Sequence, residues 1–169
     1  MKKIINIVSI VIASLLMGGC ASEELKTLVT FHMGSSVMGL PETAARELIE
    51  MPSSNFRLMC STDIFMYNGD LERVDVARVE SDGIKIDGFY FKCSISGAKK
   101  LLSLTASNLN NFIVMKINNK PMGLRKIDTV IPDGMLFVIA DVPNGKDLQK
   151  IADEINEAIE TTAKLKRDL

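Results

Sequence analysis

The stretch GFYFKCSISGAKKLLSLTASNLNNFIVMKIN, residues 88–118, predicts a strand, a helix and a second strand in succession. In its first part apolar side chains recur at every second position, the period of a strand, and these are Phe89, Phe91, Cys93 and Ile95. Ser96 can cap a helix over residues 97–109, whose buried stripe is Ala98, Leu101, Leu102, Thr105 and Leu109. Residues 111–118, NFIVMKIN, predict the second strand.

The residues before this unit predict further strands and one helix. Residues 25–33 alternate, with Val29, Phe31 and Met33 on one face and Thr30 and His32 on the other, so His32 is expected to point to solvent or a loop. Residues 41–51, PETAARELIEM, predict a helix that begins at a proline and buries Ala44, Ala45, Leu48 and Ile49. Strands follow at 56–60, 64–67 and 75–80, and Ser81-Asp82-Gly83 predicts a tight turn.

The residues after residue 118 complete the pattern. Residues 135–142, MLFVIADV, are almost all apolar and predict a central strand, after which Asn144 can cap a last helix. That helix has an apolar stripe of Leu148, Ile151, Ala152, Ile155, Ala158 and Ile159. The order of elements predicts an α+β fold with split βαβ or ferredoxin-like elements, in which a mainly antiparallel sheet carries its helices on one face.

The N-terminal segment has the pattern of an export signal. Lys2 and Lys3 precede an apolar run over residues 4–17, and the closing Gly18-Gly19-Cys20 resembles a bacterial lipobox. This resemblance implies a signal peptide over residues 1–19 and a mature chain that begins at Cys20, whose sulfur carries a diacylglyceryl group and whose amine carries a fatty acid such as palmitate. The alternatives are an ordinary signal peptide or an uncleaved anchor with a chance cysteine.

Cleavage at this point would leave a tether over residues 20–26 and a single domain over residues 27–169. Two acyl chains or more would hold that domain at a membrane. No aspartate follows Cys20 directly, which in a Gram-negative cell resembles the signal for sorting to the outer membrane. The signal holds two lysines, so the remaining chain has 18 basic and 21 acidic residues. This balance gives no indication of a nucleic-acid partner.

Cys60 and Cys93 are the cysteines of the expected domain. An exported compartment permits a disulfide between them, and both lie in predicted strands that could face each other. They could equally be two small buried apolar residues, which is common for free cysteine. The sequence leaves both possibilities open.

The sequence shows no pattern of catalytic or metal-binding residues. His32 is the only histidine, the cysteines lack metal-ligand spacing, and GSSVMG at 34–39 lacks the Lys-Ser/Thr of a phosphate loop. We therefore expect no enzymatic activity, no metal and no cofactor. Methionine-rich segments make adaptable binding surfaces, so Met33, Ser35, Ser36 and Met38 are predicted to form a partner-binding loop.

Residues 71–134 resemble the head part of the first periplasmic domain of SecD, the translocase accessory subunit. Ala98, Leu104, Thr105, Asn108, the turn at 118–120 and Ile127 fall in the order of that family. Thr105 lies on the inner side of its helix near the end, where its hydroxyl can satisfy carbonyl groups, and the asparagine turn supplies the positive φ of a hairpin. The glycine after the helix is replaced around residues 110–111, and the proline before the isoleucine segment is missing.

The membrane-spanning helices of SecD have no counterpart in this sequence, so the resemblance does not imply a motor role. What it implies is a head that contacts extended or unfolded chains. Together with the predicted anchor, this indicates an accessory lipoprotein of the cell envelope that binds an envelope protein or an emerging polypeptide. A structural or self-assembling envelope lipoprotein is the alternative, and a small-ligand binder near His32, Ser35 and Ser36 is a further one.

Overall fold

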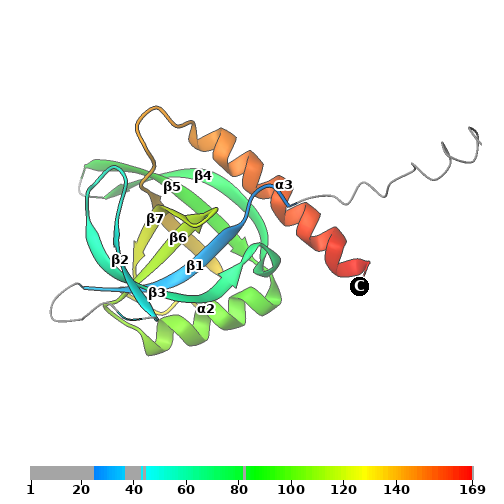
Figure 1. Ribbon diagram of the computed structural model, residues 1–169, viewed down its shortest axis with the longest axis horizontal. Coiled ribbons are helices and arrows are strands. Elements are labelled where there is room, and N and C mark those ends of the chain that lie inside the picture. Colours follow the sequence, from blue (N-terminus) through cyan, green and yellow to red (C-terminus); the bar gives the residue numbers. More distant parts are fainter. Residues whose placement is uncertain (1–24, 37–42, 44, 82, 169) are drawn as a thin grey trace, which may run out of the picture.

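The computed structural model describes residues 25–36, 43, 45–81 and 83–168. In this part of the chain eight strands form one sheet in the order β2-β3-β1-β6-β7-β8-β5-β4, and every neighbouring pair is antiparallel. The sheet is strongly curved, and the helices α2 and α3 lie beside it (Figure 1). This is the α+β fold with a mainly antiparallel sheet that the order of elements predicts.

The sheet is not a simple meander, because β1 lies between β3 and β6 and β5 lies beside β8. The α-helices follow β5 and β8 in the chain. The strands are β1 (Val29–Ser35), β2 (Arg46–Glu50), β3 (Arg57–Tyr67), β4 (Leu71–Ser81), β5 (Ile84–Cys93), β6 (Phe112–Ile117), β7 (Lys120–Lys126) and β8 (Met135–Ala140). The helices are the short 3₁₀ turn η1 (Asn68–Asp70), α2 (Ile95–Ser107) and α3 (Leu148–Arg167). The expected strands at 56–60 and 64–67 are one strand, β3.

The main core lies between one face of the sheet and both helices. Alternate residues of four strands point into it and are almost completely buried: Val29, Phe31, Phe89, Phe91, Ile113, Met115, Leu136 and Val138. Leu101 of α2 and Ile155 of α3 close the core from the other side. The Phe31 and Phe91 rings meet edge to face, with centroids 5.2 Å apart, a favoured aromatic geometry. Both helices thus cover the same face, as predicted.

A second, smaller core covers part of the opposite face of the sheet. Its buried residues are Ile49, Met51, Leu58, Cys60 and Val114. The turn between β2 and β3 is tied to the end of β8, because the Asp141 carboxylate accepts hydrogen bonds from the backbone N–H groups of Ser53 and Ser54 and from the Ser54 hydroxyl. The β2–β3 hairpin therefore reaches back across the sheet and covers β6.

The expected helix over residues 41–51 is wrong where the structure describes it. Residues 46–50 form strand β2, which pairs with β3 from Arg46 opposite Ser61 to Glu50 opposite Arg57. Ile49 and Met51 are two residues apart and share the second core, which is the period of a strand. Pairing with β3 thus overrides the helix propensity of alanine, leucine and glutamate. Pro41, Glu42 and Ala44 lie outside the described residues.

Both helices begin at a different residue from the one expected. Ser94 rather than Ser96 caps α2, and its side chain accepts from the Gly97 N–H at 3.2 Å. Ile95 therefore starts the helix and is exposed instead of sharing the strand face. Leu102 and Leu109 of the expected stripe are exposed as well. Asp147 rather than Asn144 caps α3, where it accepts from the Gln149 N–H.

Two local features predicted for residues of the SecD-like segment are present. The Thr105 hydroxyl donates to the Leu101 carbonyl at 2.8 Å and also accepts from the Ile131 N–H at 3.1 Å. Thr105 thus joins α2 to the segment before β8. Asn118 and Asn119 form the turn between β6 and β7 with positive φ of 48° and 64°, which asparagine tolerates better than most residues. In the described residues no helix is both long and apolar enough to span a bilayer.

Candidate functional site

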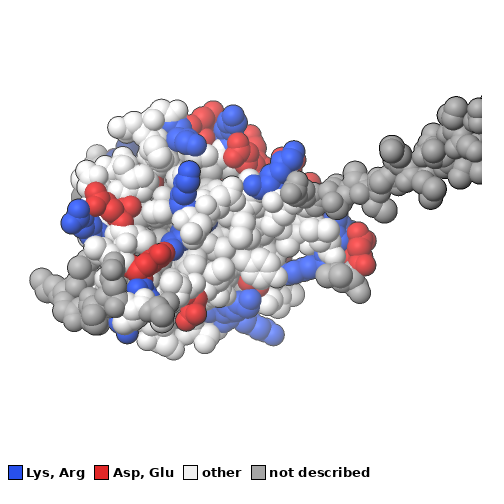
Figure 2. All heavy atoms as spheres, viewed as in Figure 1, with Lys and Arg blue, Asp and Glu red and all other residues white. Residues whose placement is uncertain are grey.

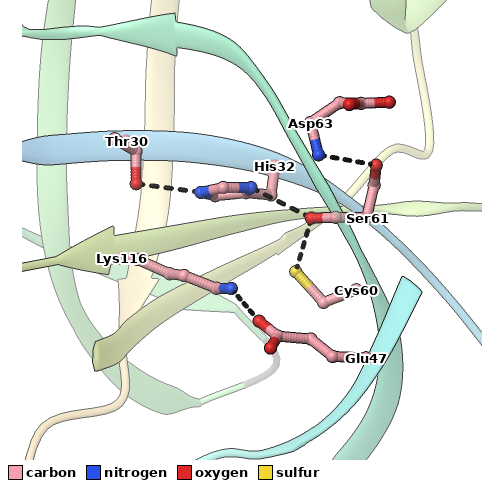
Figure 3. A network of polar contacts seen from close by, with 7 residues as sticks. All are labelled: Thr30, His32, Glu47, Cys60, Ser61, Asp63 and Lys116. Carbon is pink, nitrogen blue, oxygen red and sulfur yellow. Dashed lines mark hydrogen bonds and ion pairs between the residues drawn. The ribbon is translucent and has the colours of Figure 1, made fainter. Parts of the chain in front are cut away.

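His32 lies in a buried cluster of polar groups between β1, β3 and β6 (Figure 3). Its Nδ1–H donates to the Ser61 carbonyl at 3.0 Å, and its Nε2 lies 2.9 Å from the Thr30 hydroxyl, which can donate to it. The ring is almost fully buried, so the expectation that it points to solvent is wrong. The reason is that the β2–β3 hairpin covers the face of β1 that would otherwise be open.

Electrostatics hold the His32 ring in its neutral form. Burial lowers the pKa of His32, and the nearby positive charge of Lys116 lowers it further. A carbonyl can only accept, so the contact with Ser61 also fixes the proton on Nδ1. His32, one of the residues near which a small-ligand site is predicted, therefore has both ring nitrogens occupied by protein partners.

Lys116 reaches the same cluster from β6. Its side chain is almost completely buried and forms an ion pair with the Glu47 carboxylate, which is about half exposed at the edge of β2. Removing either partner would leave an uncompensated charge, which is costly in a buried position. The ion pair holds β2 over the second core, so we assign the Lys116–Glu47 pair a structural role.

Both cysteines of the described chain are free and buried, and they lie in different cores. Cys60 belongs to the second core and Cys93 to the main core. The possible disulfide between Cys60 and Cys93 is therefore not formed, and the alternative of two small apolar residues describes them. Burial raises the pKa of the Cys60 thiol, and it raises the pKa of Cys93 to about 12. Both thiols are protonated at neutral pH and are poor nucleophiles.

The predicted partner-binding loop is not one unit. Met33 lies in β1 and packs against the main core, and Ser35 is the last residue of β1, opposite Met59. Ser36 is exposed directly after the strand, and Met38 lies outside the described residues. The structure thus brings Met33 and Ser35 into the sheet rather than into a loop. The described residues contain no cluster of histidine, cysteine and acidic side chains that could hold a metal ion.

The end of the β4–β5 hairpin and the neighbouring β8 present apolar side chains on the face opposite to the main core. We call this surface the hairpin face; its residues are Val79, Ile84, Ile86, Tyr90 and Ile139. They share one face because Val79 pairs with Ile86 and Gly88 with Ile139. Ile84 is 64% exposed, and Val79, Tyr90 and Ile139 are 37–39% exposed. Clustered apolar side chains of this kind mark sites of protein–protein contact.

Gly88 shapes the centre of the hairpin face. A Cβ atom on Gly88 would come within 2.6 Å of the Phe137 ring, so the ring lies directly over the backbone of β5. Phe137 is half-buried and pairs with Tyr90 across the strands, which joins the apolar surface of β5 to that of β8. The surface is consequently built on regular, hydrogen-bonded strands and is preformed.

The sequence contains a pattern that predicts the hairpin face, but this pattern is missed when one face of the strand is considered alone. In IKIDGFYF, residues 84–91, apolar side chains occupy even positions before Gly88 and odd positions after it. A strand with such a change has apolar residues on both faces. Phe89 and Phe91 serve the main core, and Ile84 and Ile86 remain for the hairpin face.

Charges of both signs are mixed on the face of the molecule shown in Figure 2. Basic and acidic residues are interspersed on that face, and neither sign forms a large patch there. Ion pairs such as Arg78–Asp87 and Lys92–Glu72 accompany the strands of the hairpin. The exposed side chains that define the hairpin face are apolar, so apolar contact is the interaction that it offers.

The first described residues lie against α3. Leu25, Lys26 and Thr27 line a hollow of about 180 Å³ together with Glu157 and Thr161 of the helix. Asn68 of η1 fixes the chain that follows, because its amide donates to the Thr27 carbonyl and accepts from the Val29 N–H. The chain therefore enters the fold on the side of the helices, away from the hairpin face.

Comparison with known proteins gives a match of fold. No protein-family model matches this sequence, and no curated protein matches it. A solved structure described as "Structure and function of a membrane component SecDF that enhances protein export" has a TM-score of 0.50 and 16% identity over 80% of this chain. SecDF in a "Super-membrane-facing form" has a TM-score of 0.49 and 15% identity over 80% of this chain.

The chain spans 62% of the first SecDF chain and 19% of the second. At these identities the match concerns the fold. The fold is that of a SecDF-like domain, as the resemblance of residues 71–134 to SecD predicts.

Proposed function

We propose that this protein is an accessory domain of protein export in the bacterial cell envelope, which binds extended or unfolded polypeptides on its hairpin face. One observation carries the proposal: a fold like that of SecDF, which enhances protein export, presents preformed apolar strands with the 64% exposed Ile84 at their tip. An unfolded exported chain exposes the apolar side chains that such a surface can cover.

The domain is held at the membrane by lipid on Cys20 in this proposal. Residues 21–24 would then link the anchor to Leu25, which lies beside α3. Cys20 and Leu25 are five residues apart, and this link reaches at most about 18 Å, so α3 would stay close to the bilayer and the hairpin face would point away from it. Replacing Cys20 by alanine should abolish incorporation of labelled palmitate. Unchanged incorporation of palmitate in this variant would refute the lipid anchor.

The chemistry of the described residues gives no support for catalysis. The buried thiols are protonated, and His32 is bonded on both nitrogens. The function proposed for the chain is binding.

Binding can be measured with the full chain in phospholipid vesicles and a fluorescent, reduced and carboxymethylated model polypeptide. Covering the exposed part of Ile84 contributes about 1–2 kcal/mol, so Ile84→Asp should weaken binding roughly five- to thirtyfold. Ile95→Asp is the matched control, because Ile95 is also exposed but begins α2 on the other side of the sheet. Equal losses in both variants, or no saturable binding by the unaltered chain, would contradict the proposal.

A further inference from the structure

Strand β4 is one edge of the sheet, and among the described residues it is Asn156 that closes the first part of that edge. The Val74 N–H donates to Oδ1 of Asn156 at 2.9 Å, and the Val74 carbonyl accepts from Nδ2 of Asn156 at 2.8 Å. A carboxamide has the same donor and acceptor as a peptide group, so the Asn156 side chain of α3 takes the place of one peptide group of a neighbouring strand. Backbone groups alternate in direction along an antiparallel strand, so Val76, Arg78 and Glu80 also direct theirs away from β5.

The rest of the edge is exposed and short. Arg78, Val79 and Glu80 are exposed, and β4 ends at Ser81, which pairs with Ile84 across the turn of the hairpin. A strand edge with unpaired backbone groups is a template on which another strand can add. The free edge therefore has defined limits: Val74, which is bonded to Asn156, at one end and the turn after Ser81 at the other.

We propose that this edge pairs with the same edge of a second copy of the chain, in an antiparallel dimer whose two-fold axis passes between the two Val79 residues. In this register residues 77–81 of one copy overlap residues 77–81 of the other completely, so that Ala77 lies opposite Ser81. Arg78 and Glu80, which direct their backbone groups outward, exchange the hydrogen bonds. The two sheets then become one continuous sheet.

The charges of the edge select this register. Arg78 of each copy lies opposite Glu80 of the other, so the interface contains the complementary pair twice. Moving one copy by two residues in either direction places Arg78 opposite Arg78 or Glu80 opposite Glu80, and directly opposed like charges destabilise a strand pair. At the centre the two Val79 side chains form a pair without mutual hydrogen bonds, in which side chains come closest. The surface is self-complementary, as a two-fold interface requires.

The dimer is compatible with attachment of both copies to one membrane. A two-fold axis normal to the sheet leaves the two hairpin faces on one side, joined through Val79. It leaves both α3 helices, with Leu25 beside each, on the other side. The inference rests on the β4 edge and does not depend on the proposed binding of polypeptides.

Cysteine crosslinking of the full chain in bacterial membranes tests the pairing. Val79→Cys places a thiol opposite its own copy at the axis, so a mild oxidant should convert most of this variant into a covalent dimer. Ala77→Cys is the matched control, because it lies on the same edge and face but opposite Ser81. It should form little dimer alone and a crosslinked dimer when co-expressed with Ser81→Cys. Equal crosslinking of Val79→Cys and Ala77→Cys alone, or crosslinks only to other proteins, would overturn the inference.

Charge complementation gives a second test that misfolding cannot imitate. Glu80→Arg and Arg78→Glu each place like charges opposite each other in a dimer of identical copies, so each should lose the Val79→Cys crosslink. Mixed together, the two variants oppose Arg to Glu at every position, and the crosslink should return. Retention of the crosslink in either single variant, or no return in the mixture, would refute the proposed register.

Discussion

Replacing Asn156 by alanine removes both hydrogen bonds through which α3 closes the start of the β4 edge. The two bonds, at 2.9 and 2.8 Å, join the side chain to the backbone of the buried Val74. Each bond contributes about 1 kcal/mol, and each partly buried group left without a partner costs about 1–3 kcal/mol. The higher helix propensity of alanine offsets about 0.5 kcal/mol of this loss of stability.

The free energy of unfolding should therefore fall by about 2–4 kcal/mol, and Tm by roughly 4–16 °C for a chain of this size. Thermal and urea denaturation followed by circular dichroism measures both quantities. Glu160→Ala, an exposed substitution on the same helix, is the control and should change stability by at most about 0.5 kcal/mol. Asn156→Asp adds a pH test.

In the Asn156→Asp variant the ionised carboxylate accepts from the Val74 N–H but repels the Val74 carbonyl. This variant should therefore regain stability when acid protonates the carboxylate. If Asn156→Ala leaves the free energy of unfolding unchanged, the assignment of Asn156 as the residue that closes the edge is refuted.

Three further outcomes are expected. Gly34→Ala should lower the free energy of unfolding by about 1–3 kcal/mol in urea titrations, because the added Cβ overlaps the Leu58 side chain; unchanged stability would contradict tight packing of the second core at Gly34. Leu101→Ala should lower it by about 2–5 kcal/mol and Leu102→Ala by less than about 1 kcal/mol, since only the first is buried; equal effects would show that α2 packs by another face. The pKa of His32 is lowered in the fold, so the contribution of this histidine to the free energy of unfolding is complete above about pH 6.5. That contribution is lost as the pH falls below about 6.5, by at most about 1.4 kcal/mol per pH unit. His32→Gln should remove this slope between pH 7 and 5, and an unchanged slope would mean that another group causes it.

The local sequence pattern predicts the main core well, because the core residues of each element follow either the period of a strand or the period of a helix. Phe89 and Phe91 alternate along a strand, and Ile151, Ile155 and Ile159 recur along a helix, and all five are buried in the same core. The turns at Gly83 and at Asn118 follow equally from residues that accept positive φ. These features depend on neighbours in the sequence, which is why they can be predicted without the fold.

The second core cannot be predicted in this way. It depends on β2 pairing with β3 and on Asp141 binding a turn 87–88 residues away in the sequence. Without this cover His32 and Thr30 read as an exposed face, and residues 46–50 read as a helix. The hairpin face is the intermediate case: the change of apolar face at Gly88 is visible in the sequence, but only the sheet order shows that no helix of the described chain covers it.

Photo-crosslinking in cells tests most directly the central claim that the hairpin face contacts exported polypeptides. A photoreactive amino acid at position 84 should capture many different exported chains, identified by mass spectrometry. The same amino acid at position 85, which is exposed on the opposite face of β5, should capture few. No captured protein from position 84, or the same proteins from both positions, would contradict the account.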